Sequence, residues 1–411
     1  MKINKHCFPN GLRLVHYEDT STQMVALNIV YDVGARDEHP EHTGFAHLFE
    51  HLMFGGSAHI PDYDTPLQLA GGENNAWTNN DITNYYLTVP KPNVETAFWL
   101  ESDRMLELAF SEQSLEVQRG VVMEEFKQRC LNQPYGDVGH LFRPLAFRVH
   151  PYRWPTIGKE LSHIEQATLD EVKSFFYRFY APNNAVLAVT GNISWDETDK
   201  LTEKWFAPIP RRDVPVRQLP QEAEQTQERR LTVERNVPLD ALFMGYHMCS
   251  REGADYYAFD ILSDILSNGR SSRLNRRLVQ EQNIFSGIDA YISGTRDAGL
   301  LQISGKPAAG VSLEQAEAAV RKELEELQRS PVDGQELEKV KNKFESTQIF
   351  GNINYLNVAT NLAWFELTGK AEDIDLEVER YRSVTTEQLH TVAQRTFCES
   401  NAVVLYYKSD K

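Results

Sequence analysis

The sequence lacks any long apolar run. Nowhere does it approach the roughly 18 consecutive apolar residues of a membrane-spanning helix, and residues 1–11 lack the apolar stretch of a signal peptide. Hydrophobic residues make up 41% of the 411 residues and charged residues 25%, which is the composition of a globular protein. We therefore expect a cytoplasmic protein with no membrane partner.

Cysteine is scarce. The four cysteines, Cys7, Cys130, Cys249 and Cys398, lie far apart, and none of them forms a CxxC pair. This spacing indicates neither a thiolate zinc site nor a disulfide framework. We expect four reduced and partly buried thiols, because free cysteine is among the most buried residue types.

Basic residues are also in the minority. Lys and Arg number 42 against 59 Asp and Glu, which gives a net charge of −17. Nucleic-acid binding needs a basic surface to meet the phosphates, so this balance argues against a nucleic-acid partner. The acidity either favours basic or neutral peptides over acidic ones by long-range attraction, or simply aids solubility.

The chain contains an internal repeat. Residues 168–187 align without a gap with residues 385–404, at an offset of 217 residues. The same offset pairs the apolar segment 24–31 with 241–248, so two matches in one register predict two copies of one domain. The identical pairs in the first match are Thr168/Thr385, Arg178/Arg395, Asn184/Asn401, Ala185/Ala402 and Val186/Val403.

Each copy mixes helix and strand patterns. Because the two kinds of element do not alternate strictly, we expect an α+β fold of two tandem homologous domains, each with helices packed on a mostly antiparallel sheet. A proline-rich polar stretch predicts a linker at 213–227, between a first domain at 1–212 and a second at 228–411. In the first copy, helical periodicity appears at about 43–54, 92–110, 112–131 and 168–180, apolar strand-like runs appear at 11–18, 24–33, 74–89 and 184–191, and Asn10-Gly11 predicts a hairpin turn.

One predicted helix carries the residues that suggest a chemistry. Thr43 can cap this helix, and the glycines at 55–56 can end it. His47 and His51 are four residues apart, so both imidazoles lie on one face and can reach one ion at about 2.0–2.1 Å. Glu50 lies on the same side, where it can act as a general base on a metal-bound water.

The remaining positions of this helix are largely apolar, so the helix must be mostly buried. Two histidines and a glutamate on a buried helix are costly without a partner, and a metal ion supplies that partner. The alternative is a buried helix whose two histidines are hydrogen-bonded within the core. The order HxxEH on an apolar helix disfavours this alternative.

A catalytic zinc site needs a third protein ligand and one open position. The segment 115–126 offers the adjacent carboxylates of Glu124 and Glu125 on a helix with an apolar stripe. Their side chains point about 100° apart, so one can face inward while the other meets solvent. Periodicity does not settle which one faces inward. We expect loop or capping contacts for His39 and His42 and a structural role for His150.

These segments resemble the pitrilysin-like family of metallopeptidases, which includes insulinase and the mitochondrial processing peptidase. The resemblance lies in His47-Leu-Phe-Glu-His51 followed by Val121-Val-Met-Glu-Glu125. It implies a zinc endopeptidase of the short two-domain type, with one zinc ion per chain and peptide substrates held in an enclosed chamber. It extends along nearly the whole chain, through 75–78, 150–152, Gly158, 180–183, Gly191 and 269–274.

The resemblance also implies roles for individual residues. It makes Glu125 the third ligand beside His47 and His51, with Glu50 as the base. It further implies that a peptide adds to a sheet edge, where main-chain pairing gives affinity without demanding one sequence. The residues implied to line this cleft are Asn75, Ala76 and Trp77.

One position departs from the family pattern. Gln118 stands seven residues before Glu125, where the family often has a glutamate that supports the site. An amide can hydrogen-bond but carries no charge, so the departure bears on catalytic strength rather than on zinc binding. The offset of 217 carries His47, Glu50 and His51 to Asp264, Ser267 and Asn268, so the second copy lacks the motif.

The short chains of this family resemble half of a larger clamp, which implies a dimer of identical chains or a pair with a related chain. Two rival functions remain. One is a non-catalytic or partner-dependent subunit of a heterodimeric peptidase, for which the intact motif is unexpected. The other is a zinc-dependent hydrolase of non-peptide amides, which would show no dependence on peptide length.

Overall fold

A computed structural model describes residues 1–410 of the chain. These residues form two compact units, and each unit is assembled from separate stretches of sequence. Unit 1 comprises Met1–Leu131, Trp154–Pro220 and Ile349–Leu376, and unit 2 comprises Asn132–Arg153, Gln221–Gln348 and the residues from Glu377 onward. The predicted division into 1–212 and 228–411, with a linker at 213–227, separates the two copies of the sequence repeat. It stays a prediction.

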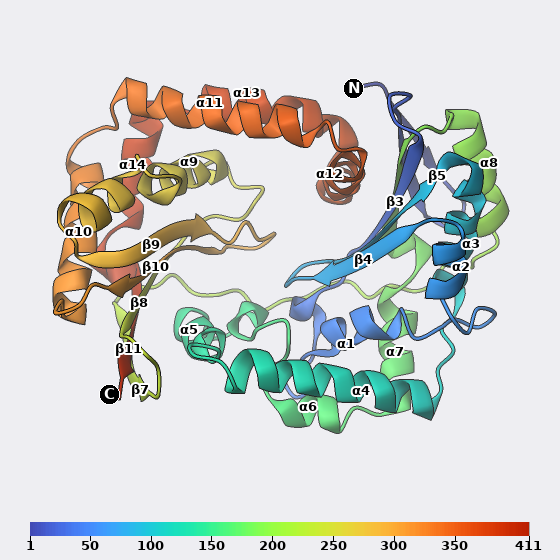
Figure 1. The fold of residues 1–411 in the computed structure, drawn as a ribbon, viewed down its shortest axis with the longest axis horizontal. Coiled ribbons are helices and arrows are strands. Elements are labelled where there is room, and N and C mark those ends of the chain that lie inside the picture. The colour runs from blue at the N-terminus through green and yellow to red at the C-terminus, as the bar shows by residue number, and fades with distance from the viewer. Residues whose placement is uncertain (411) are drawn as a thin grey trace. The chain divides into compact units, whose positions relative to one another are not determined.

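Unit 1 is built on a six-stranded sheet with the order β1-β2-β6-β3-β5-β4, of which Figure 1 labels β3, β5 and β4. Neighbouring strands are antiparallel except β2 and β6, which run parallel. β4 is an edge strand, because only its β5 side is paired within the sheet. The strands are β1 (Ile3–Cys7), β2 (Arg13–Glu18), β3 (Met24–Tyr31), β4 (Glu73–Thr78), β5 (Thr83–Pro90) and β6 (Ala185–Gly191).

Helices pack on both faces of this sheet. Along β3, Leu27 and Ile29 belong to the core shared with α1, α3 and α7, whereas Ala26 and Val30 face the core shared with α12. The helices are α1 (Phe45–Leu52), α2 (Asp64–Leu69), α3 (Val94–Leu106), α4 (Glu112–Phe126), α6 (Leu161–Glu165), α7 (Leu169–Phe179), α8 (Trp195–Phe206) and α12 (Tyr355–Thr368). Shorter turns are η1 (Ala35–Asp37), η2 (Lys91–Asn93), the π-helical η3 (Lys127–Leu131), η5 (Pro182–Asn184) and η7 (Ala371–Leu376).

Unit 2 has a five-stranded sheet with the order β7-β11-β8-β10-β9, in which only β7 and β11 are parallel neighbours. The strands are β7 (Arg229–Arg235), β8 (Ala241–His247), β9 (Phe285–Ile292), β10 (Leu300–Pro307) and β11 (Ala402–Ser409). The helices are α5 (Val138–Ala146), α9 (Tyr256–Ser267), α10 (Leu313–Arg329), α11 (Gly334–Gly351, which ends in unit 1), α13 (Glu377–Ser383) and α14 (Thr386–Thr396), with short turns η4 (Pro151–Arg153), η6 (Asn275–Glu281) and η8 (Glu399–Asn401).

The two sheets repeat one topology. Without β1, the strands of unit 1 have the order β2-β6-β3-β5-β4. Their counterparts in the second repeat have the same order in unit 2, which is β7-β11-β8-β10-β9. The offset of 217 residues carries β5 onto β10 and α7 onto α14 with identical bounds. The expected α+β fold of two homologous domains with mostly antiparallel sheets is therefore confirmed.

The repeats exchange one helix. At the offset of 217, α5 of the first repeat corresponds to α12 of the second. α5 belongs to unit 2, where Phe142 and Ala146 pack against Val403 and Leu405 of β11. α12 belongs to unit 1, where it packs on β3 and β6. Each sheet is thus covered on one face by a helix from the other half of the sequence.

The local predictions for the strands of unit 1 are confirmed with one refinement. β1 and β2 form the hairpin expected at Asn10-Gly11, and Gly11 has a φ of 90°. The apolar run at 74–89 is two strands, β4 and β5, with a turn at 79–82 between them. Among the helices formed by residues 1–410, none combines the length and apolar character needed to cross a membrane.

Candidate metal centre

Helix α1 is not capped by Thr43, which corrects the expectation from the sequence. The N-cap is Gly44, whose φ of 87° suits glycine, and an added Cβ there would lie 2.9 Å from the Ile157 carbonyl oxygen. The Thr43 hydroxyl instead lies 2.9 Å from His163 Nδ1. The buried carboxylate of Glu38 takes over the cap, because it accepts hydrogen bonds from the Gly44 and Ala46 amides at 3.0 and 2.9 Å.

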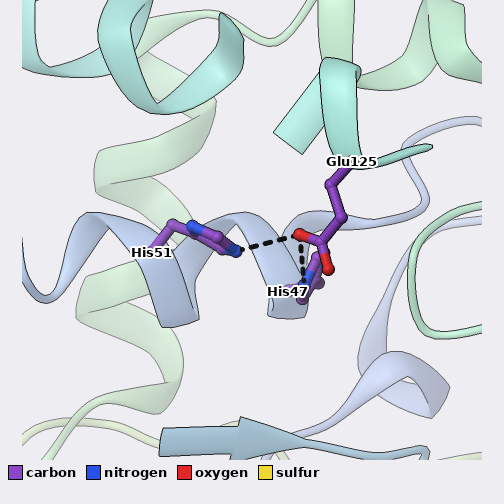
Figure 2. A group of neighbouring side chains, drawn as sticks. All are labelled: His47, His51 and Glu125. Carbon is purple, nitrogen blue, oxygen red and sulfur yellow. Dashed lines mark ion pairs between the residues drawn. The ribbon is translucent and has the colours of Figure 1, made fainter. Parts of the chain in front are cut away.

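The structure brings His47, His51 and Glu125 together. Both histidines project from one side of α1, and the Glu125 carboxylate reaches them from the C-terminal end of α4 (Figure 2). Glu125 Oε2 lies 3.5 Å from His47 Nε2 and 3.3 Å from His51 Nε2. One candidate ligand atom from each residue lies within 4.8 Å of the others, and this is the only such trio of donors that residues 1–410 contain.

These distances fit a shared cation better than direct contact. A tetrahedral zinc site with bonds of about 2.0–2.1 Å separates neighbouring donor atoms by about 3.3 Å. A direct N–H···O hydrogen bond is shorter, typically about 2.7–3.2 Å. Two imidazole nitrogens and one carboxylate oxygen are also the donor types of catalytic zinc sites. The residues present therefore fit a zinc ion.

The surroundings of His47 favour its metal-binding form. Burial, which outweighs the opposing effect of Glu125 and is assisted by nearby His51 and Arg129, lowers the pKa of His47 to about 4. The ring is consequently neutral at pH 7, as a metal ligand must be. Its Nδ1 atom is buried and has no hydrogen-bond partner within the described part of the chain. A cation bound at Nε2 would leave the ring proton on this Nδ1 atom.

Glu50 lies beside the cluster without belonging to it. Burial raises the pKa of Glu50, while the Thr78 hydroxyl and His51 lower it and Glu125 raises it. Glu50 directly precedes His51 on α1. A carboxylate with a raised pKa next to a metal site is suited to accept a proton from water and to release it again.

Of the two adjacent glutamates, Glu125 is the one that faces inward. Its side chain is 18% exposed, whereas that of Glu124 is 57% exposed and pairs with Lys127 at 3.8 Å. The alternative that periodicity left open is therefore decided by packing of α4 against α1.

The three residues implied to bind substrate lie on the edge strand β4, which packs beside α1. Trp77 is 37% exposed, and Asn75 is also exposed, whereas Ala76 packs against the core of unit 1. Because β4 is paired only with β5, the main-chain groups of its outer edge can accept another strand.

Gln118 and the other histidines lie outside the cluster. An added Cβ at Gly55 would lie 3.9 Å from Gln118 Nε2, so this amide lies near the end of α1. His42 pairs with Glu171 at 3.2 Å, and His150 is buried in unit 2, 3.4 Å from Asp297. Those contacts agree with structural roles.

The sequence reasoning missed two supporting residues. Glu38 caps the metal-binding helix although it precedes the nearer histidine by nine residues, and nothing in its local pattern indicated this. Arg129 lies 2.8 Å from Glu125 Oε1, and its spacing of four residues from Glu125 could have indicated the pair.

Known sequences resemble both halves of the chain. Residues 13–137 match the sequence profile of the insulinase family (peptidase family M16), and residues 166–344 match the profile described as the peptidase M16 inactive domain. The chain is 26% identical to a zinc protease of Helicobacter pylori named PqqE, over 97% of this chain and 91% of that protein. It is 25% identical to an uncharacterized zinc protease of Bacillus subtilis, YmxG, over 98% of both chains.

Solved structures share the fold. The crystal structure of a protease from Helicobacter pylori matches with a TM-score of 0.93 and 25% identity, covering 99% of each chain. The crystal structure of pitrilysin matches 99% of this chain with a TM-score of 0.78 and 18% identity, but only 45% of the pitrilysin chain is covered.

Proposed function

Since the chain belongs to the insulinase family (peptidase family M16), we propose that it is a zinc-dependent endopeptidase with its metal site at His47, His51 and Glu125. The observation that carries this proposal is that Glu125 Oε2 lies 3.5 Å from His47 Nε2 and 3.3 Å from His51 Nε2, with Glu50 next to His51 on the same helix. Relatives of the chain are named zinc proteases, which supports the proposal of a zinc-dependent peptidase.

The proposed reaction is hydrolysis of a peptide bond by water. When bound, zinc would polarise the scissile carbonyl and lower the pKa of a water molecule at its open position. Glu50 accepts a proton from the attacking water and then delivers it to the leaving amine. His47 and His51 would bind the zinc ion, and because the His47 ring is neutral, its lone pair is available for the ion.

The proposed substrate is an extended peptide. The open edge of β4 offers main-chain donors and acceptors next to α1, where Asn75, Ala76 and Trp77 would line the bound peptide. Pairing with a strand edge reads the peptide backbone, so it tolerates many sequences. The net charge of −17 favours basic or neutral peptides during the encounter.

We further propose that the working form contains two chains, either identical or related. This chain covers 45% of pitrilysin with the same fold, so a pair of such chains would match the size of that protein. A second chain would also allow the substrate to be enclosed. An alternative is that this chain is a partner-dependent subunit, since residues 166–344 match a domain described as inactive.

The test is a peptidase assay on the purified chain. Internally quenched peptides of increasing length are incubated with the chain, with the chain after chelation, and with the chelated chain after zinc is returned. We expect cleavage that chelation abolishes and zinc restores, with a dependence on peptide length. Cleavage that survives complete metal removal would overturn the proposal, and activity only after a related chain is added would favour the subunit alternative. Native mass measurement reports the oligomeric state.

A further inference from the structure

The chain changes its helical geometry directly after Glu125. Helix α4 ends at Phe126, and the next five residues form the π-helical turn η3 (Lys127–Leu131). Such turns are rare and occur often at functional sites. The turn contains Arg129, whose Nη2 atom lies 2.8 Å from Glu125 Oε1.

The two oxygens of the Glu125 carboxylate have different partners. Oε2 faces both imidazoles, at 3.5 Å from His47 Nε2 and 3.3 Å from His51 Nε2. Oε1 is engaged by the guanidinium of Arg129. The arginine therefore holds the carboxylate in the rotation that presents one oxygen to the histidines.

We propose that Arg129 is a positioning residue that fixes Glu125 as a single-oxygen metal ligand. This inference rests on the proposed metal site and concerns how that site is built. Residues that orient a ligand without touching the metal typically contribute 10–100-fold to metal affinity. Gln118, which lies near Gly55 at the end of α1, carries no charge to do the same.

Two effects of Arg129 on zinc have opposite signs, which makes the proposal testable. Its positive charge repels a divalent cation, so removing the charge alone would tighten zinc binding. Its contact with Glu125 orients a ligand, so removing that contact would weaken zinc binding. The Arg129 side chain is 68% exposed, so the ion pair contributes little to folding, and its removal should leave the protein folded.

The chain provides a matched control in the same segment. Lys127 pairs with Glu124 at 3.8 Å, and these side chains are 42% and 57% exposed. Replacing Lys127 removes one positive charge two residues from Arg129, but the partner carboxylate does not face the histidines. The control therefore reports the effect of charge without the effect of orientation.

The experiment measures the zinc affinity of the full chain by competition with a chromophoric chelator, and the thermal unfolding of the metal-free protein. We expect Arg129→Ala to weaken zinc binding about 10–100-fold, Arg129→Lys to recover part of this loss, and Lys127→Ala to bind zinc at least as tightly as the wild type. The metal-free unfolding midpoints should be unchanged.

Unchanged or tighter zinc binding by Arg129→Ala would overturn the inference, and so would an equal loss in Lys127→Ala. In either case a wild-type chain that binds zinc leaves the proposed metal site standing. A wild-type chain that binds no zinc would overturn both.

Discussion

Asp264 and Asn268, the counterparts of His47 and His51 in the second repeat, are hydrogen-bonded to each other. The Asn268 Nδ2 atom donates to Asp264 Oδ1 at 2.8 Å, and Lys343 donates to the Asn268 side-chain oxygen. The counterpart of Glu125 is Asn342, which accepts a hydrogen bond from Arg382. In unit 1 the three side chains direct candidate ligand atoms toward one another. In unit 2 the residues at the corresponding positions are hydrogen-bonded to one another or to other side chains of that unit.

The first prediction concerns metal stoichiometry. We expect one zinc ion per chain, because only the first repeat presents three converging donors within residues 1–410. His47→Ala should lose more affinity than the roughly 10–100-fold expected of a supporting residue, while Asp264→Ala should retain the metal. Elemental analysis of the purified variants measures this. Full zinc retention in His47→Ala would contradict its assignment as a ligand.

The second prediction separates chemistry from metal binding. Glu50→Gln should keep zinc but lose about 10²–10⁴-fold in kcat, because the amide cannot take a proton from water. Glu124→Gln, which alters an exposed neighbour of Glu125, should leave kcat unchanged. Steady-state kinetics with a quenched peptide, together with metal analysis, checks both. Near-normal turnover in Glu50→Gln would exclude it as the base.

The third prediction concerns the cap of α1. Glu38→Ala leaves the Gly44 and Ala46 amides without their acceptor in a buried position. We expect a loss of about 1–3 kcal/mol in the free energy of unfolding, together with weaker zinc binding, because the helix that carries both histidines loses its anchor. Glu41→Ala removes an exposed carboxylate from the same loop and should change neither quantity. Urea unfolding and chelator competition measure the two effects, and equal losses in both variants would contradict the capping role.

The fourth prediction follows from the exchanged helices. A fragment of residues 1–220 lacks α12, so it exposes Val30 and Val186 on one face of its sheet. We expect this fragment to aggregate when produced alone and to become soluble when residues 221–411 are produced with it. Size-exclusion chromatography and circular dichroism check this. Cooperative unfolding and zinc binding by the isolated fragment would show that the exchange is dispensable.

The fifth prediction is a pH dependence of stability in unit 2. Burial alone would raise the pKa of Glu317, but hydrogen bonds from Arg230, Tyr406 and Arg321 outweigh it and lower the pKa to about 2. The unfolded chain therefore binds a proton between about pH 4.5 and 2 that the folded chain does not. The stability contributed by Glu317 is present above about pH 4.5 and is lost as the pH falls towards 2.

We expect this contribution to be about 1–2 kcal/mol after allowance for solvent screening. Urea unfolding at a series of pH values should show a shallower acid dependence for Glu317→Gln than for the wild type. Glu325→Gln, which alters a half-exposed carboxylate on the same helix, is the control. An unchanged acid dependence in Glu317→Gln would refute the assignment.

The sequence by itself determined the elements and the residue pattern of the site. The periodicity at 112–131 and 168–180 predicted α4 and α7, because which side chains can share one helical face depends only on their spacing. For the same reason, the spacing of His47 and His51 was enough to predict that both could reach one ion. The repeat at an offset of 217 predicted the second sheet, because two similar sequences form similar elements.

Only the tertiary structure decided how distant segments complete one another. The choice between Glu124 and Glu125 depends on which side of α4 meets α1, and the positions of Glu38 and Arg129 depend on the loop and the π-helical turn that carry them. The exchange of α5 and α12 between units likewise leaves no local pattern, because an apolar helix face fits either sheet. Contacts between residues far apart in the chain depend on packing, which the spacing of residues along one element does not encode.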